Sequence, residues 1–426
     1  MKKTLSLAIS LLMIATTLFA GGSSETAAAA DDGSVNIVWA GWSGEEEATR
    51  QIFQDMRTGY EAESGNTVQW VGWTWSDTTQ QYLIRIQGGE QLDIGQVDSG
   101  NIFFTVASTG TLADLNEVFG EEWLKENFEE STLAAGQIDG KQVGLPWSMA
   151  ALGMVYNPEI LARAGWDTPP VTIAEFEQCC EDILALDEGI IPYGVCTKED
   201  TAAGDLQPWF WTFGTTIYND DLSINLGPEA VETIDWYKSM LEKGYIAMDI
   251  GRGDARQLFA QGKMAFYNDA VLAKGEVVAA GVDPDEVVNV CSAMNRPVLN
   301  EGDDPQSTIW GHMLVIFDTS DHKEEAADFA KYLLSEDVAM EYFRQNGMPP
   351  VTKSTANSEE VLGDAYLMGF INATATSRLD ETARMTNASE IKAIIVEELQ
   401  RTLLGQTTSE QCIENMRTRL DAATIR

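Results

Sequence analysis

The sequence is poor in basic residues and in histidine. Its 426 residues include 27 Lys and Arg against 67 Asp and Glu, which gives a formal net charge of −40, and it has two histidines, His312 and His322. A surface of this sign repels nucleic acids, anionic lipids and polyphosphates, so these partners are excluded. The two histidines do not stand at helical spacing, so no paired-histidine metal site is predicted.

The motifs of common enzyme classes are also missing. No glycine-rich loop ends in Lys-Ser or Lys-Thr to hold a phosphate, and no dinucleotide fingerprint follows a strand. The run Gly41-Trp42-Ser43-Gly44 is close to a nucleophile elbow but lacks the second spacer before its last glycine. We therefore expect no enzyme activity and no cofactor. A glycosidase with a pair of carboxylates remains an alternative, because 67 acidic residues always supply candidates.

Long apolar runs are absent apart from residues 5–19. This run follows Lys2 and Lys3 and precedes small residues, which is typical of a secretory signal peptide over residues 1–20. It is shorter than the roughly 20 residues of a membrane-spanning helix. Gly21 rather than cysteine follows the predicted cut, so we expect a periplasmic or extracellular protein that is not a lipoprotein. Residues 21–33 are small or polar and predict a disordered leader.

Cysteine is scarce, with five residues that match no zinc-site spacing. An odd number leaves at least one cysteine unpaired in an exported protein, and we expect buried free thiols. The alternative is one disulfide bond, which would join Cys179 or Cys180 to Cys196.

The most informative segment is residues 145–183, LPWSMAALGMVYNPEILARAGWDTPPVTIAEFEQCCEDI. An apolar strand over residues 152–156 leads to Asn157, which can cap a helix that has Pro158 at its first position. After a Pro-Pro turn, Thr172 and Glu175 form a capping box that opens a second helix.

In its residues and their order, this segment resembles the corresponding segment of the family 1 extracellular solute-binding proteins of ABC sugar importers. Three further segments are similar to the same family: DARQLFAQGKMAFYNDA (254–270), IWGHMLVIFDTSDHKEEAADFAKYLLSEDVAMEYFRQNGMPPV (309–351) and LLGQTTSEQCIENM (403–416). The resemblance covers most of the mature chain. It implies an α/β, bilobal periplasmic-binding-protein fold of type II, with two parallel-rich sheets flanked by helices and three hinge crossings.

The order of elements agrees with this fold, because strands and helices alternate from the start of the mature chain. The resemblance places the three crossings near residues 148–150, 266–269 and 317–319. The expected division is 34–148 and 268–317 for lobe 1, and 149–267 and 318–426 for lobe 2.

The candidate site residues are aromatic and polar residues at predicted strand ends and loops. Open α/β sheets bind ligands at the carboxyl ends of their strands, and indole rings pack on the C–H faces of sugars. Trp39 and Trp236 are expected in the core instead, and Asp98 is also a possible helix cap. Trp42, Trp73, Trp75 and Trp211 are placed in polar loops. The predicted ligand-binding residues are Trp42, Ser43, Glu45, Trp73, Trp75, Asp98, Trp147, Trp209, Trp211, Asn268, Asp269, Trp310, His312 and Arg378.

The resemblance therefore implies a monomeric receptor that captures a carbohydrate between two lobes by hinge closure and delivers it to ABC permease subunits. A receptor for a polyamine or an amino acid is one alternative, because the chain is acidic. An exported sugar sensor that presents its ligand to a signalling receptor is another.

Overall fold

The structure is a computed structural model that describes residues 34–219 and 221–425. The predicted signal peptide (1–20) and leader (21–33) lie outside these residues. Within them, no helix is both long and apolar enough to cross a membrane.

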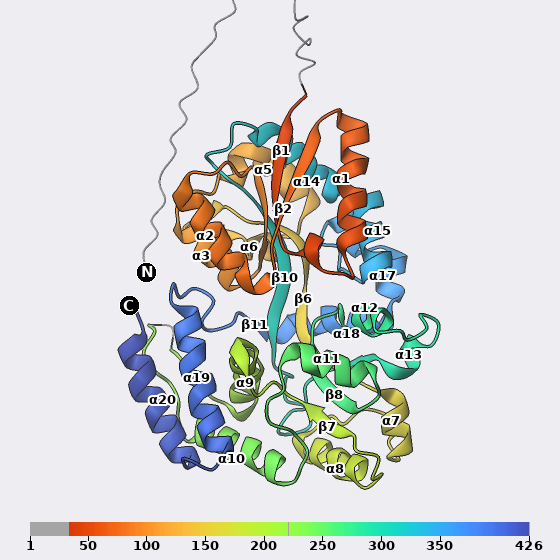
Figure 1. Ribbon diagram of the computed structural model, residues 1–426, viewed down its shortest axis with the longest axis vertical. Coiled ribbons are helices and arrows are strands. Elements are labelled where there is room, and N and C mark those ends of the chain that lie inside the picture. The colour runs from red at the N-terminus through yellow and green to blue at the C-terminus, as the bar shows by residue number, and fades with distance from the viewer. Residues whose placement is uncertain (1–33, 220, 426) are drawn as a thin grey trace, which may run out of the picture. The chain divides into compact units, whose positions relative to one another are not determined.

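One mixed sheet runs through the folded body in the order β2-β1-β3-β10-β6-β8-β7 (Figure 1). The pairs β1–β2, β1–β3 and β7–β8 are parallel, whereas β10 and β6 pair antiparallel with their neighbours in this order. The strands are β1 (Asn36–Gly41), β2 (Thr67–Gly72), β3 (Ile94–Asp98), β4 (Gln137–Ile138), β5 (Lys141–Gln142), β6 (Leu145–Tyr156), β7 (Ile191–Gly194), β8 (Met264–Asp269), β9 (Ser292–Met294), β10 (Ser307–Ile316) and β11 (Ser377–Arg378).

Lobe 1 is built on β1, β2, β3 and the second half of β10. Its core joins Trp39 and Phe53 to Phe329, and a second layer surrounds Tyr82 and Phe103. Its helices are α1 (Arg50–Ser64), α2 (Thr78–Gly88), α3 (Asn101–Ser108), α4 (Leu115–Phe119), α5 (Glu121–Asn127), α6 (Glu130–Ala134), α14 (Lys323–Leu333) and α15 (Glu336–Asn346).

Lobe 2 is built on β7, β8 and the second half of β6. Phe176, Trp209 and Ile395 belong to its main core. Its helices are α7 (Pro158–Arg163), α8 (Ile173–Leu184), α9 (Glu199–Phe213), α10 (Pro228–Glu242), α11 (Arg252–Ala260), α12 (Ala273–Ala279), α13 (Val287–Val290), α18 (Ala365–Ala373), α19 (Ala388–Leu403) and α20 (Ser409–Ala423). The short helices α16 (Lys353–Ala356) and α17 (Glu359–Gly363) lie between α15 and α18.

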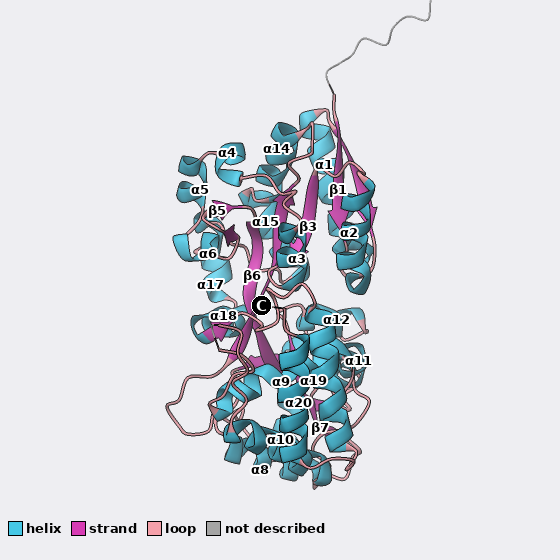
Figure 2. Ribbon diagram, turned by 90° about the vertical axis from the view of Figure 1, so that its left-hand side faces the viewer, coloured by secondary structure: helices cyan, strands magenta, loops and turns pink. Residues whose placement is uncertain are grey.

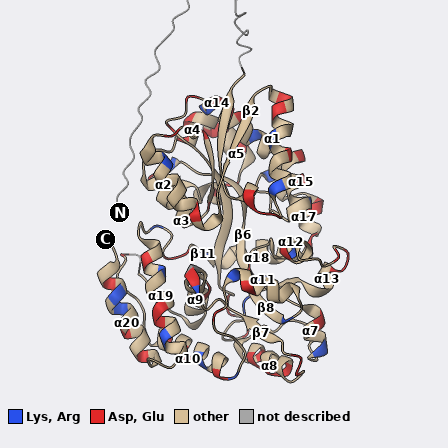
Figure 3. Ribbon diagram, viewed as in Figure 1, with Lys and Arg blue, Asp and Glu red and all other residues tan. Residues whose placement is uncertain are grey.

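The two lobes are joined by β6, β10 and the segment that carries α16 and α17. Residues 145–152 of β6 pair with β10, and residues 153–156 pair with β8. Figure 2 shows β6 in the middle, with α6, α17 and α18 on one side and α3 and α12 on the other. The charged side chains lie mainly on the helices and loops, and the central strands are almost free of them (Figure 3).

Along β6 the pairing partner changes from β10 to β8 between residues 152 and 153, just beyond the first predicted crossing at 148–150. The strand pairing does not place the other two crossings at 266–269 and 317–319. Residues 266–269 end β8 inside lobe 2, because β8 pairs with β6 and β7 on its two sides. Phe317 is a core residue of lobe 1 and donates its backbone N–H to the Asp93 carbonyl. The expected division placed residues 318–426 in lobe 2, whereas α14 packs into the core of lobe 1. Helix α15 contributes Tyr342 to that core, and its Met340 and Phe343 belong to a cluster that includes lobe 2 residues. In the same way, α12, α13 and β9 pack with lobe 2 rather than lobe 1.

Local sequence signals are confirmed at the predicted helix starts. The Asn157 side chain accepts a hydrogen bond from Ile160 N–H, with Pro158 as the first helical residue. Thr172 and Glu175 form both hydrogen bonds of a capping box. The polar loop predicted around Trp211 is wrong: this residue lies in α9, and the helix contains Pro208 without ending there.

Candidate functional site

Two adjoining cavities lie where the lobes meet. The large cavity has a volume of about 710 Å³ and is lined by Ala48 and the end of α15 from lobe 1, and by α12, α13 and α18 from lobe 2. The small cavity has a volume of about 30 Å³. The two share Ala48, Gly275 and Asn346 as lining residues. Together they form one site, whose walls belong to both lobes.

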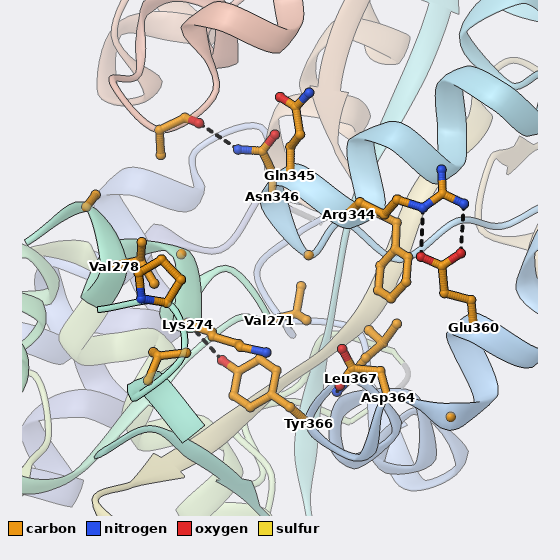
Figure 4. A pocket seen from close by; sticks show the side chains of 18 residues that line it. Val271, Lys274, Val278, Arg344, Gln345, Asn346, Glu360, Asp364, Tyr366 and Leu367 are labelled. Atoms are coloured by element: carbon orange, nitrogen blue, oxygen red, sulfur yellow. Dashed lines mark hydrogen bonds and ion pairs between the residues drawn. The ribbon is translucent and has the colours of Figure 1, made fainter. Parts of the chain in front are cut away.

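The large cavity has an apolar floor and a rim of balanced charge. Val271, Val278, Phe343 and Leu367 supply aliphatic and aromatic surface. Figure 4 shows this floor with the charged groups around it. On the rim, Arg344 donates two hydrogen bonds to Glu360, each of 2.7 Å.

The remaining charges of the large cavity also balance. Lys274 extends along Tyr366, with its ammonium 5.8 Å from the ring centre, and Asp364 is the carboxylate on the opposite wall. Two cations therefore face two carboxylates. A cavity of this kind suits an uncharged molecule that has both apolar faces and hydrogen-bonding groups.

The small cavity has mainly apolar surface with several polar side chains set into it, among them His312. This side chain is 6% exposed, and its Nδ1 lies 3.2 Å from Gln96 Nε2. Burial lowers the pKa of His312 to about 3, so the ring is neutral. Because Gln96 Nε2 can only donate, His312 Nδ1 accepts and the proton resides on Nε2. Ring contacts hold the imidazole in place, with centroids 5.0 Å from Trp42 and 5.0 Å from Trp310.

A cluster of charges borders the small cavity on the lobe 2 side. Arg256 donates to both carboxylate oxygens of Asp269, at 2.8 and 2.9 Å, and lies 3.6 Å from Glu276. Burial would raise the pKa of Asp269, but Arg256 outweighs this effect and holds it below the ordinary value. From lobe 1, Glu46 lines the same cavity, and burial raises its pKa while Arg256 opposes the shift. Arg256 therefore acts electrostatically on carboxylates of both lobes.

The structure brings five of the sequence-predicted residues together at or beside the small cavity. Ser43 and His312 line it, and Trp42 and Trp310 hold the imidazole. Asp269 joins them through Arg256.

Trp147 packs behind the small cavity, with its ring 6.5 Å from His312 and 5.3 Å from Tyr342, and the remaining predicted residues have separate surroundings. Trp147 and Trp209 belong to the cores of lobe 1 and lobe 2, and Trp73 lies beside Tyr82 and Arg85. Trp75 is 51% exposed. The remaining polar residues already have partners within the protein: Glu45 accepts a hydrogen bond from the Trp70 indole, and Asp98 accepts from backbone N–H groups at the start of α3. Asn268 forms hydrogen bonds with Tyr193 and Arg296. Trp211 donates to Glu381, and the guanidinium of Arg378 lies over the Trp211 ring.

The residues that line the large cavity were not predicted from the sequence. Most of them lie at the end of α15 and on α12 and α18. The amphipathic patterns of these helices indicate that one face is buried, but they do not indicate a ligand site. The Gly347 turn that ends α15 is the one local signal, because a glycine at positive φ (69°) marks the point where the chain leaves the helix near the site.

A third cavity, of about 760 Å³, opens on the other face of the crossing strands. Ile309 lines this rear cavity, whereas His312, three residues further along β10, lines the small one. Residues an odd number apart in a strand face opposite sides of the sheet. Within the part of the chain that the structure describes, no group of three or more His, Cys, Asp or Glu is placed to hold a metal ion.

Comparisons with known proteins agree with this architecture. The family model for bacterial extracellular solute-binding proteins matches residues 41–340. A binding protein of Brucella abortus (strain 2308) is 25% identical over 403 residues, which is 93% of this chain and 94% of that protein. The sn-glycerol-3-phosphate-binding periplasmic protein UgpB of Brucella melitensis is 22% identical over 346 residues, covering 75% of this chain and 76% of its own.

Solved structures show the same fold. A solute-binding protein of an ABC transporter from Thermotoga lettingae, bound with α-D-tagatose, has a TM-score of 0.78 at 22% identity and covers 91% of this chain and all of its own. The GacH receptor of Streptomyces glaucescens, solved unliganded and with acarbose, has a TM-score of 0.80 at 18% identity and covers 91% of this chain and 97% of its own. With the family model matched over most of the folded body, the chain belongs to the family of bacterial extracellular solute-binding proteins.

Proposed function

We propose that this solute-binding protein is the receptor of an ABC importer and captures an uncharged carbohydrate in the two adjoining cavities between its lobes. The observation that carries this proposal is the large cavity, whose two cations and two carboxylates balance around an apolar floor. Sugars combine apolar C–H faces with many hydroxyl groups, and they carry no charge. The tagatose and acarbose bound by the structural neighbours support this ligand class.

Delivery would follow from hinge closure. A ligand that touches Ala48 and α15 on one side and α12 and α18 on the other is held by both lobes only when they close. Such a ligand shifts the population toward the closed form by its difference in affinity for the two forms. The closed form then docks on the permease subunits, and the receptor performs no chemistry on its cargo. We propose that the receptor is monomeric and exported.

A polyamine is the second candidate, because carboxylates outnumber cations beside the small cavity. Asp269, Glu276 and Glu46 surround the single guanidinium of Arg256. Against this candidate, Lys274 places an ammonium in the large cavity, where it would repel a second cation. A phosphate ester is disfavoured because Arg252 and Arg256, the arginines of α11, are already paired with Asp205 and Asp269.

Isothermal titration of the purified protein would test the proposal. We expect maltose, maltotetraose or D-tagatose to give saturable binding, and spermidine and sn-glycerol 3-phosphate to give none. Binding of spermidine without binding of any sugar would replace the carbohydrate by the polyamine. After long incubation with maltotetraose, the number of reducing ends should not change, whereas an increase would indicate a glycosidase.

A further inference from the structure

Two polar side chains at the end of α15 are buried without a hydrogen-bond partner. Tyr342 is 2% exposed, and its hydroxyl lies near the Ser43 side chain but meets no donor or acceptor in hydrogen-bond geometry. The side-chain oxygen of Asn346 is buried and unpartnered as well. Buried polar groups in native proteins are nearly always hydrogen-bonded, so two such groups on one helix call for an explanation.

The two side chains share one face of α15 and one cavity. They are four residues apart, which places them on the same side of the helix, one turn apart. Both line the small cavity, and Asn346 lines the large cavity as well. A molecule in the large cavity can therefore place one group in the small cavity between Tyr342 and Asn346.

The surroundings fix the orientation of both groups. The Tyr342 ring packs 5.3 Å from Trp147 and 6.0 Å from Phe53, so it cannot turn away without opening the core of lobe 1. Asn346 donates from Nδ2 to the Ala48 carbonyl at 2.6 Å, which is drawn in Figure 4. Since a carbonyl accepts only, this bond sets which end of the amide is nitrogen and leaves Oδ1 as a free acceptor.

We propose that Tyr342 and Asn346 together read one hydroxyl group of the bound carbohydrate, an inference that rests on the proposed function. The tyrosine Oη donates to the ligand oxygen, and the same hydroxyl donates its hydrogen to Asn346 Oδ1. A hydroxyl group satisfies both partners because it both donates and accepts. An ammonium group can only donate, so it would leave the tyrosine hydrogen unpaired.

The pair also bears on specificity. Tyr342 and Asn346 are buried, so a ligand that lacks this hydroxyl leaves both polar groups without a hydrogen bond in the closed form. A site built to hydrogen-bond a ligand hydroxyl strongly rejects analogues that lack it. The pair would therefore favour a sugar that has a hydroxyl at this position over a ligand that only fits the apolar floor.

The test compares two conservative variants. Tyr342→Phe removes only the hydroxyl and keeps the ring in its core contacts. Tyr267→Phe is the matched control, because Tyr267 is fully buried, its hydroxyl lies near Asp269 but outside hydrogen-bond geometry, and it lines none of the cavities described above. Each protein would be titrated with maltose, maltotetraose and D-tagatose, and its melting temperature would be measured without ligand.

We expect Tyr342→Phe to raise the Kd of the tightest-binding of these sugars about tenfold, the value of one neutral hydrogen bond, while Tyr267→Phe leaves it unchanged. Both variants should melt at or above the wild-type temperature, because each loses an unsatisfied buried hydroxyl. Wild-type affinity in Tyr342→Phe, an equal loss in both variants, or a marked loss of stability in Tyr342→Phe alone would each overturn the inference. If the wild-type protein binds no sugar, the proposed function falls and the inference falls with it.

Discussion

At the scale of single residues, the site depends on charges that are paired before any ligand arrives. Asp269 is 2% exposed, and its carboxylate is held by both donor arms of Arg256. Arg344 and Glu360 form an equally short pair, but their side chains are 50% and 44% exposed. The two pairs have the same geometry and differ in burial, so comparing them isolates the effect of burial on the stability that an ion pair contributes.

The first prediction compares these pairs. Arg256→Ala leaves a buried carboxylate without its partner and should lower the free energy of unfolding by about 3–5 kcal/mol. Arg344→Ala removes a pair open to water and should cost no more than about 1 kcal/mol. Urea denaturation measures both values. Equal losses in the two variants would contradict the importance given to burial.

The second prediction concerns pH. Because Arg256 holds the pKa of Asp269 below its ordinary value, this group contributes stability above the pKa of the unfolded chain, about 3.9, and loses it as the pH falls through the folded value. In Arg256→Ala, burial without the guanidinium raises that pKa, and a proton then neutralises the unpaired charge. The difference in stability between wild type and variant should therefore be largest near pH 7 and shrink toward pH 4. A difference that stays constant over this range would show that Asp269 is not its source.

At the scale of the elements, the structure rests on the close pairing of β6 and β10. Gly311 lies opposite Met149, and a Cβ atom placed on it would come within 2.6 Å of the Ser148 carbonyl oxygen. The obstructing atom belongs to the backbone of a strand that joins the lobes, so it cannot move aside easily. This position therefore requires glycine because of the close approach of the strands.

The third prediction tests this requirement with two glycines. Gly311→Ala should destabilise the protein by about 1–3 kcal/mol, as overpacking of a tight site does. At Gly204, inside α9, an added Cβ atom would meet no side chain or neighbouring segment within 4 Å. Gly204→Ala should instead stabilise the protein by about 0.5–1 kcal/mol, because alanine loses less backbone entropy in a helix. Thermal unfolding should show a lower melting temperature for Gly311→Ala and a higher one for Gly204→Ala. An unchanged melting temperature in Gly311→Ala would show that the strands can separate locally.

Sequence reasoning succeeded where the signal is local. The caps at Asn157 and Thr172 were predicted correctly, because a cap depends on residues that are three or four positions apart in the sequence. It missed the placement of α14 and α15, whose amphipathic pattern shows that one face is buried but not which lobe buries it. It also missed Tyr342 and Asn346, because an aromatic residue at helical spacing has the appearance of an ordinary core residue.

At the scale of the whole molecule, the buried thiols show that the fold does not depend on disulfide bonds. All five cysteines lie within the described residues, and all are buried and free. Burial raises the pKa of Cys179, Cys196 and Cys291 to about 12. The expectation of free thiols is confirmed, and the alternative bridge to Cys196 does not form. Because the thiolate is the reactive species, these groups are inert in the native protein.

The fourth prediction follows from this protection. Ellman's reagent should react with almost no thiol in the native protein and with five per chain in urea. A reducing agent should leave the melting temperature unchanged. Four or fewer reactive thiols after unfolding would indicate that a disulfide bond does form.

The central claim is that a sugar clamps the two lobes together, and the buried cysteines allow a direct test. Single cysteines introduced at Glu63 on α1 and at Leu404 after α19, both exposed, would accept spin labels while the native thiols stay protected. The distance between the labels would then be measured by pulsed electron resonance without ligand, with maltose, with maltotetraose and with D-tagatose. The account predicts a shift of the distance distribution to a new, narrower maximum with any sugar that binds by titration, whereas an unchanged distribution with a bound sugar would contradict it.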